Sequence, residues 1–188
     1  MKRTLLDAAQ AVGGQLVGDD HRYAAVSTDS RTLKPGTLFV ALRGPNFNGR
    51  DFVAAAAAQG AIGAVVEGAV PHALAQIVVP DALRALQQLG QAWRAEFTVP
   101  IVAVGGSNGK TTAKEMTSAI LSRMGPCLAT HGNLNNHIGL PLSLLRFDES
   151  AQVIVTEIGM NHAGEISELA KIAKPNIGVV TNVGHAHI

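Results

Sequence analysis

The chain has 188 residues, enough for one large domain or two modest ones that each bury a core. Its residues are 47% hydrophobic and only 15% charged, a composition that excludes a disordered chain. The formal net charge of +1 gives no basic footprint, so we expect no nucleic-acid partner. The single cysteine, Cys127, is typical of a reducing compartment. No hydrophobic run approaches the roughly 20 residues that span a bilayer, so we expect a cytoplasmic protein without a membrane span.

The first half of the sequence alternates short helical and strand patterns. Thr4 is placed to cap a helix that runs to about Val12, with Asp7 in its first turn. Asp81 begins a longer helix that stops before Pro100. We therefore expect a first domain over residues 1–98 and a second over residues 99–188. Within the first domain the patterns predict a helix at 51–59 and strands at 23–27, 38–42, 62–67 and 76–79.

From Ile101 onward the pattern is strictly strand, helix, strand, helix. It predicts strands at 101–104, 127–129, 153–157 and 177–182, and helices at 111–124, 140–145 and 164–173. Hydrophobic strands that alternate with helices indicate a parallel sheet covered on both faces. The predicted fold class is α/β, with a small N-terminal α/β domain followed by a P-loop-type domain built on a parallel sheet. No helix follows the last strand, so we expect this second domain to be incomplete.

A glycine-rich loop connects the strand at 101–104 to the helix at 111–124. Its glycines allow backbone N–H groups to turn toward phosphates, and the helix presents its positive end. Lys110 supplies a mobile charge for the outer phosphates, and the Thr111 hydroxyl is placed to bind Mg²⁺. A glycine-rich turn without nucleotide is the less favoured alternative. The sequence therefore predicts an ATP site formed by Gly106, Ser107, Asn108, Gly109, Lys110, Thr111 and Thr112.

Glu157 ends the strand at 153–157, and the carboxyl ends of strands in open parallel sheets are where ligands bind. From the residues alone, two interpretations of Glu157 stay open: a magnesium ligand shared with Thr111, and a solvated or capping carboxylate. His185 and His187 follow the last strand, and a histidine pair without carboxylates is more often structural than metal-binding.

Two polar segments are further candidates. Ser27-Thr28-Asp29-Ser30-Arg31 places hydroxyls and a guanidinium at a strand end, and arginine binds phosphate through two parallel hydrogen bonds. A surface pair between Asp29 and Arg31 is the alternative that the residues alone favour. The amide-rich stretch at 133–137 either contacts polar ligand groups or simply forms turns.

Taken together, these segments resemble the Mur ligases of bacterial peptidoglycan synthesis. The resemblance is carried by the phosphate loop and by residues 27–31, 39–44, 131–141, 157–166 and 181–187, so it covers essentially the whole chain. Gly105 departs from the family, which usually has threonine there. The resemblance implies a ligase that uses ATP and Mg²⁺ to convert a substrate carboxylate into an acyl phosphate, which an amine then attacks.

The resemblance also implies the substrates and the residues that act on them. The substrates would be UDP-N-acetylmuramoyl-tripeptide and D-alanyl-D-alanine, bound by a monomer. Lys110 and His187 would act at the reaction centre, with Thr111, Glu157 and His187 as metal ligands. Substrate contacts would come from Ser30, Arg31, Arg43, Asn136 and His137. Because members of the family also have a C-terminal domain, we expect this chain to show no turnover by itself.

Three alternatives remain open. A sibling Mur ligase that adds a diamino acid has similar loops. A folylpolyglutamate-type synthetase shares the phosphate loop but would lack the segment at 27–31. A non-catalytic module that binds nucleotide or UDP-sugar would carry the same binding residues.

Overall fold

The computed structural model describes residues 3–132, 134–148, 150–160, 162 and 164–184. Contacts divide the chain into two compact units, Met1–Leu89 and Gly90–Ile188. This division falls inside the helix α3 (Ala82–Ala95). The sequence instead predicts a domain boundary between residues 98 and 99, after the end of α3, and that boundary stays a prediction. Within the described part of the chain, no helix is both long and hydrophobic enough to span a membrane.

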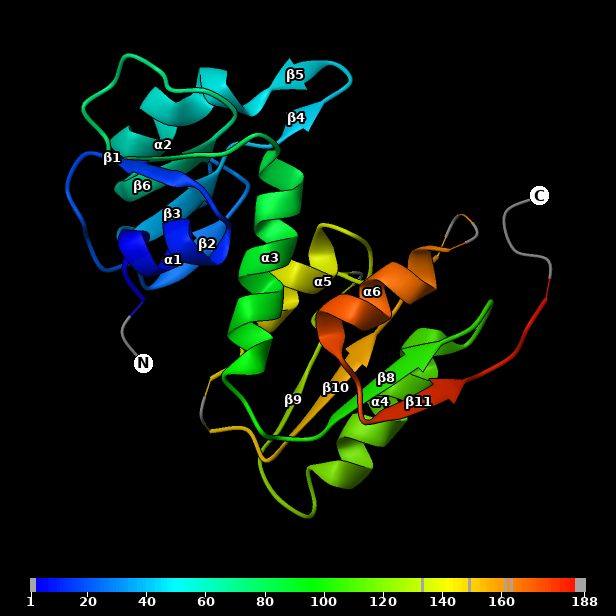
Figure 1. Ribbon diagram of the computed structural model, residues 1–188. Helices are drawn as coiled ribbons and strands as arrows, with labels where there is room; N and C mark the ends of the chain where they lie inside the picture. Colours follow the sequence, from blue (N-terminus) through cyan, green and yellow to red (C-terminus); the bar gives the residue numbers. More distant parts are fainter. Residues whose placement is uncertain (1–2, 133, 149, 161, 163, 185–188) are drawn as a thin grey trace. The chain divides into compact units, whose positions relative to one another are not determined.

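The first unit is built on a five-stranded sheet with the order β1-β7-β6-β3-β2 (Figure 1). β1 runs antiparallel to β7, and the other neighbours are parallel. A separate hairpin pairs β4 (Arg43–Gly44) with β5 (Phe47–Asn48). The remaining elements are α1 (Leu5–Ala11), β1 (Gln15–Val17), β2 (Ala25–Ser27), β3 (Thr37–Val40), the 3-10 helix η1 (Gly49–Phe52), α2 (Val53–Ala58), β6 (Ala61–Val66) and β7 (Gln76–Val78).

Local sequence explains where several of these elements begin. The Thr4 hydroxyl accepts a hydrogen bond from the Asp7 amide (3.1 Å), and the Asp7 carboxylate accepts one from the Thr4 amide (3.2 Å). This reciprocal cap begins α1 where the sequence predicts it. β3 is buried along its whole length because it lies inside the sheet with a hydrophobic core beside it. That core contains Leu33, Phe39, Ala41, Val53, Ala56, Ala61, Ala64 and Val66.

The second unit is built on a four-stranded parallel sheet with the order β11-β8-β10-β9. The helix α4 lies on one face of this sheet, and α5 and α6 lie on the other (Figure 1). The predicted α/β class with a parallel sheet is confirmed. The elements are β8 (Ile101–Gly105), α4 (Lys110–Leu121), β9 (Cys127–Ala129), α5 (Gly139–Leu144), β10 (Val153–Glu157), α6 (Glu165–Ala173) and β11 (Ile177–Val180).

The register of this sheet brings three strand ends to one edge. Glu157 at the end of β10 is level with Val104 of β8, and Val180 at the end of β11 is level with Gly105. The glycine-rich loop after β8 therefore has Glu157 on one side and the segment after β11 on the other.

The last turns of α3 belong to the second unit. The buried guanidinium of Arg94 donates hydrogen bonds to the carbonyl oxygens of Phe97 (2.6 Å), Ala173 (3.0 Å) and Lys174 (3.4 Å). The carbonyls of Ala173 and Lys174 lie at the C-terminal end of α6, where a cation is electrostatically favourable. Trp93 donates from Nε1 to the carbonyl of Phe147 (2.9 Å), so the last turn of α3 is fixed to the segments that follow α5 and α6.

Candidate nucleotide-binding site

The glycine-rich loop turns tightly between the end of β8 and the start of α4. Gly106 has φ +130° and Gly109 has φ +76°, conformations that L residues rarely adopt. A Cβ at Gly106 would also collide with the hydroxyl oxygen of Thr181. The backbone conformation of the loop therefore requires glycine at both positions. In this conformation the N-terminus of α4 points toward a ligand bound at the loop.

Residues after β11 fix the shape of this loop. The Ser107 amide donates to the Asn182 carbonyl (3.1 Å), and the Asn108 amide donates to Asn182 Oδ1 (2.9 Å). The Thr181 hydroxyl donates to the Asn108 carbonyl (2.6 Å). The Ser107 hydroxyl contacts both the carbonyl (2.9 Å) and the amide (3.0 Å) of Gly184. The loop is thus held in one conformation by a different part of the chain.

Lys110, the first residue of α4, lies over the loop. Its Nζ donates to the carbonyls of Gly106 (2.8 Å) and Ser107 (3.1 Å). The ammonium group therefore sits on the loop, next to the helix N-terminus that would bind phosphate. Gly109, Thr111 and Thr112 beside it are solvent-exposed, so a nucleotide can reach this end of the helix.

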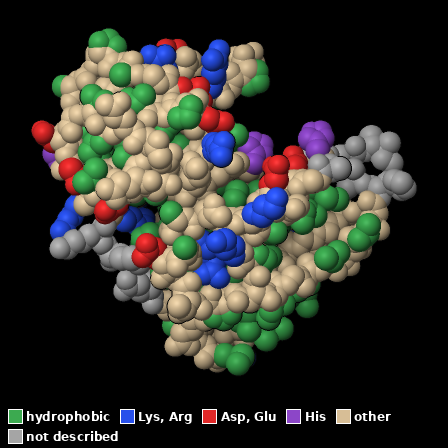
Figure 2. Space-filling model, in the orientation of Figure 1, with side chains coloured by type: hydrophobic (Ala, Val, Ile, Leu, Met, Phe, Trp, Pro, Cys, Tyr) green, Lys and Arg blue, Asp and Glu red, His purple; other side chains and the backbone are tan. Residues whose placement is uncertain are grey.

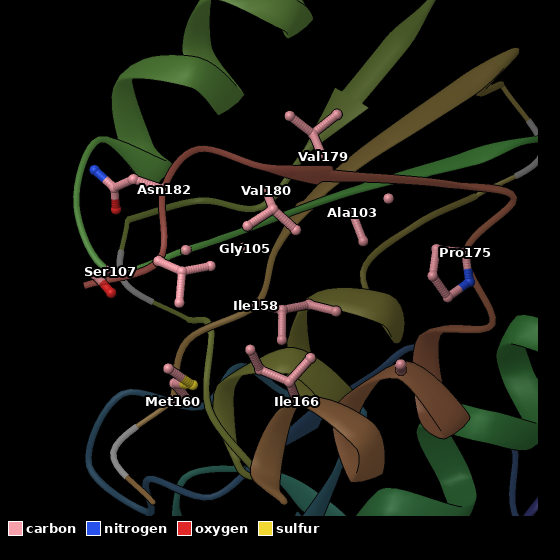
Figure 3. A pocket seen from close by; sticks show the side chains of 14 residues that line it. Ala103, Gly105, Ser107, Ile158, Met160, Ile166, Pro175, Val179, Val180 and Asn182 are labelled. Atoms are coloured by element: carbon pink, nitrogen blue, oxygen red, sulfur yellow. The ribbon is translucent and has the colours of Figure 1, made fainter. Parts of the chain in front are cut away.

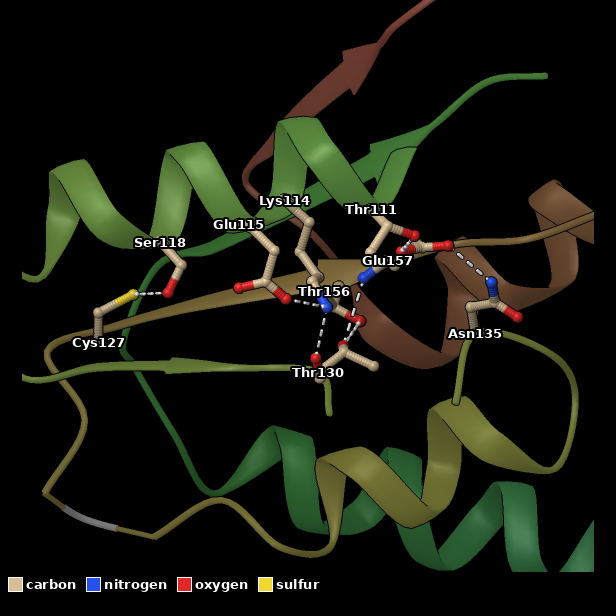
Figure 4. Close-up of polar contacts among 9 residues, drawn as sticks. All are labelled: Thr111, Lys114, Glu115, Ser118, Cys127, Thr130, Asn135, Thr156 and Glu157. Atoms are coloured by element: carbon tan, nitrogen blue, oxygen red, sulfur yellow. Dashed lines mark hydrogen bonds and ion pairs between the residues drawn. The ribbon is translucent and has the colours of Figure 1, made fainter. Parts of the chain in front are cut away.

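The carboxylate of Glu157 lies opposite Thr111 (Figure 4). Its Oε2 accepts a hydrogen bond from the Thr111 hydroxyl (2.9 Å), and its Oε1 accepts one from Asn135 Nδ2 (2.7 Å). Glu157 is only 2% exposed, so its charge faces the loop rather than bulk water. The structure brings together the two residues that the sequence proposes as metal ligands, although their role stays a prediction.

The donors at this position fit magnesium. A carboxylate and a hydroxyl are hard oxygen ligands, and Mg²⁺ usually takes one or two carboxylates together with waters and phosphate oxygens. No group of three or more His, Cys, Asp or Glu side chains that could hold a metal ion occurs within the described ranges. The geometry therefore suits an ion shared with a phosphate ligand rather than an all-protein metal site. His185 and His187 lie outside the described residues.

In the amide-rich segment, Asn135 contacts Glu157; for this residue the sequence left both a contact with polar ligand groups and a turn-forming role open. Asn135 donates to the carboxylate, whereas Asn136 Oδ1 accepts from the amides of Ile138 (3.1 Å) and Gly139 (2.8 Å), just before and at the first residue of α5. His137 is exposed and precedes α5. Substrate contacts by Asn136 and His137 stay predictions, with a structural role now assigned to Asn136.

Sequence reasoning also missed Lys114, Thr130, Thr181 and Asn182. Lys114 lies one turn beyond Lys110 and Thr111 on α4, so its spacing was a usable signal for a shared helix face. Thr181 and Asn182 belong to a segment that carries the resemblance, but nothing in the local sequence indicates their contacts with the loop, because only the parallel pairing of β11 with β8 brings them there.

In the first unit, the candidate substrate residues differ in their exposure and in their hydrogen-bond partners. Arg31 donates to both carboxylate oxygens of Asp29, from Nε (2.9 Å) and from an Nη (3.0 Å), which is the surface pair that the residues alone favour. These hydrogen bonds lower the pKa of Asp29 to about 2. Ser30 is buried, and Arg43 is exposed on the β4–β5 hairpin. Their contacts with a substrate stay predictions.

A hydrophobic cavity of about 180 Å³ lies beside the loop, between α6 and the β8–β11 side of the sheet (Figure 3). Its walls include Ile158, Met160, Ile166 and Val180. Such walls do not suit phosphate, which the loop amides and Lys110 would bind instead.

The charged side chains on the surface are of both kinds. The face drawn in Figure 2 carries acidic and basic side chains together, rather than side chains of one charge alone.

Comparison with known families gives two matches that together span most of the chain. The pattern of the Mur ligase middle domain matches residues 104–188, and that of the Mur ligase family catalytic domain matches residues 22–96. A curated relative, the UDP-N-acetylmuramoyl-tripeptide--D-alanyl-D-alanine ligase of Synechocystis sp., is 43% identical over 175 residues. That alignment covers 92% of this chain and 38% of the relative.

Solved structures give the same picture. MurF from Acinetobacter baumannii is 39% identical with a TM-score of 0.94, over 100% of this chain and 42% of that one. MurF ligase from Thermotoga maritima, solved in complex with ADP, is 34% identical with a TM-score of 0.79, over 87% of this chain and 38% of that one. The chain therefore spans about two fifths of the length of the proteins it matches.

Proposed function

Since the chain belongs to the Mur ligase family, we propose that it supplies the UDP-sugar-binding and ATP-binding domains of a ligase that joins D-alanyl-D-alanine to UDP-N-acetylmuramoyl-tripeptide. The family is ATP-dependent, and the Thermotoga maritima structure was solved with ADP. We place the reaction in the cytoplasm. The observation that carries this proposal is the contact between Thr111 and Glu157 beside a phosphate loop held in shape by Thr181 and Asn182.

In the proposed reaction, a carboxylate oxygen of the tripeptide attacks the γ-phosphorus of ATP, and ADP leaves with the bridging oxygen. The amine of D-alanyl-D-alanine then attacks the acyl carbon, loses a proton, and displaces inorganic phosphate. Both partners of the first step are anions that repel each other. The protein must therefore offset negative charge at the γ-phosphate as the new bond forms.

The residues of this chain divide that task. The N-terminus of α4 and the loop amides orient the phosphates, while Lys110 moves from its loop carbonyls to the outer phosphates. Thr111 and Glu157 would hold Mg²⁺, which supplies positive charge to the phosphate oxygens. His187 would be a further ligand by resemblance. Arg31 and Arg43 supply the charges by which the first unit would bind a diphosphate.

Nucleotide binding by the 188-residue chain tests this proposal. We expect ATP to bind, and Lys110→Ala to weaken it roughly tenfold or more, since a charged hydrogen bond contributes about 1.5–3 kcal/mol. Lys171→Ala is the matched control, because Lys171 is an exposed lysine on α6. Equal ATP affinity of both variants in isothermal titration calorimetry would refute the assignment of the loop.

Binding of the sugar nucleotide is a separate test. We expect UDP-N-acetylmuramoyl-tripeptide to shift NMR resonances near Ser30, Arg31 and Arg43. Arg43→Ala should weaken this binding, whereas the exposed Arg84→Ala should not. Shifts confined to the phosphate loop would instead favour a nucleotide module without this substrate.

A further inference from the structure

A buried lysine lies on α4, one turn after Thr111, which contacts Glu157 (Figure 4). Lys114 belongs to α4, and its side chain is only 1% exposed. Its Nζ donates to the Thr130 carbonyl (2.8 Å) and forms an ion pair with Glu115 Oε1 (2.8 Å). The hydrogen bond from Lys114 lowers the pKa of the Glu115 carboxyl. Burying an ammonium group costs free energy that hydrophobic packing does not return, which points to a specific task for Lys114.

Thr130 connects Lys114 to Glu157. The Thr130 amide donates to the Val155 carbonyl (2.9 Å), and its hydroxyl donates to the Thr156 hydroxyl (3.0 Å). The same hydroxyl oxygen accepts a hydrogen bond from the Glu157 amide (3.3 Å). Lys114 therefore fixes a residue that contacts three successive positions at the end of β10.

Asn135, which follows Thr130 in the chain, contacts the other oxygen of the Glu157 carboxylate. Thr130 follows β9 and begins the segment that carries Asn135, whose amide group donates to Glu157 Oε1 and whose carbonyl accepts from the Gly159 amide (2.8 Å). Glu157 Oε2 faces Thr111, which lies one turn before Lys114 on α4. Lys114 thus connects α4, which carries the proposed metal ligand Thr111, to the segment after β9, which carries Asn135 and thereby orients the proposed ligand Glu157.

We propose that Lys114 is a positioning residue that sets Glu157 for magnesium by holding Thr130. This inference rests on the proposed function, because it requires that Glu157 and Thr111 bind the ion. Lys114 itself does not contact the ion or the nucleotide. Its effect passes through the Thr130 carbonyl, the Thr130 hydroxyl and the Asn135 segment.

The first test compares Lys114→Met with the wild-type 188-residue chain. ATP affinity is measured over a series of Mg²⁺ concentrations and again in EDTA. We expect the variant to need about tenfold more Mg²⁺ for half-maximal enhancement of ATP binding, as for the loss of groups that orient metal ligands. The affinity in EDTA depends on the phosphate loop and should match the wild-type value.

Two substitutions at Thr130 separate the effect of losing its hydroxyl group from the effect of changing the side-chain volume. Thr130→Val removes the hydroxyl that holds the Glu157 amide and should reproduce the Mg²⁺ effect, while Thr130→Ser should restore it. Glu115→Gln keeps the bond from Lys114 to Thr130 and should behave as wild type. If Lys114→Met does not fold, the Thr130 pair decides the question.

NMR gives a readout that needs no metal. In EDTA, Lys114→Met should shift the side-chain amide resonances of Asn135 and speed hydrogen exchange of the Glu157 amide. A lower melting temperature with unchanged Mg²⁺ dependence and unchanged Asn135 resonances would overturn the inference, because Lys114 would then serve stability alone. Absence of Mg²⁺-dependent ATP binding in the wild-type chain would overturn the proposed function instead.

Discussion

At the scale of single residues, the conformation of the phosphate loop depends on Gly106. A methyl group there would meet the Thr181 hydroxyl, in a backbone conformation that alanine rarely adopts. Gly106→Ala should therefore displace Thr181 from the Asn108 carbonyl and weaken ATP binding roughly tenfold or more, since roughly 1–3 kcal/mol of strain would act on the site. Titration calorimetry of the 188-residue chain measures this change.

The control is Gly178→Ala, because nothing lies within 4 Å of a Cβ added at that glycine of β11. It should bind ATP as the wild-type chain does. If the two alanine variants have the same affinity, the contact between Gly106 and Thr181 does not shape the site.

The pair between Asp29 and Arg31 predicts a pH dependence. The pKa of Asp29 is lowered from 3.8 to about 2, chiefly by hydrogen bonds from Arg31. A carboxyl with a depressed folded-state pKa contributes stability that is present above pH 3.8 and lost as the pH falls through about 2. NMR titration of the Asp29 carboxyl carbon should therefore show a midpoint near 2, and Arg31→Gln should return it toward 3.8. A wild-type midpoint at the ordinary value would mean that the pair does not persist in solution.

Local sequence reveals some site residues and conceals others. Lys110 and Thr111 follow from the loop motif, and Glu157 follows from its position at a strand end. The contacts of Asn182 with Asn108 and of Asn135 with Glu157 could not be found this way, because the partners lie 74 and 22 residues apart in the sequence. On α4 the expectation that hydrophobic side chains are buried and charged ones exposed even misleads, since Met116 and Ile120 are exposed while Lys114 is buried.

At the scale of elements, Arg94 joins the end of α3 to the end of α6. Arg94→Met keeps the aliphatic part of the side chain but leaves the Phe97, Ala173 and Lys174 carbonyls without this donor. We expect a loss of about 2 kcal/mol or more in the free energy of unfolding. Arg84→Met, at an exposed position of the same helix, should change it by less than about 0.5 kcal/mol. Urea unfolding followed by Trp93 fluorescence measures both, and equal midpoints would show that Arg94 is dispensable.

Most elements could be predicted because each carries a strong local pattern. The strands at Cys127–Ala129 and Val153–Glu157 have the predicted bounds, and Asp81 begins α3 by accepting from the Arg84 amide (2.9 Å). β1 was missed, and so was the β4–β5 hairpin. The hairpin strands have two residues each, too few for a period of two to emerge. The three residues of β1 are not fully buried, and this strand forms by pairing with the distant β7.

At the scale of the whole molecule, the place of the domain boundary can be tested by truncation. Leu86 and Leu89 are buried, and a chain that ends at residue 89 cuts α3 in its middle. Because short helices are unstable without their following turns, we expect residues 1–98 to fold and residues 1–89 to be less stable. Thermal unfolding monitored by circular dichroism compares the two. Equal melting temperatures would place the boundary within α3.

The hydrogen bond between Asn108 and Asn182 has a consequence for biosynthesis, because it joins residues 74 positions apart. A ribosome adding about 5–20 residues per second needs roughly 4 to 15 s to make that stretch. Until then the nascent loop lacks its partners, and β8 lacks β10 and β11 on both sides. ATP therefore cannot guide the early folding of this unit. Nucleotide binding requires that β10 and β11 have paired with β8 and that Asn182 has reached the loop.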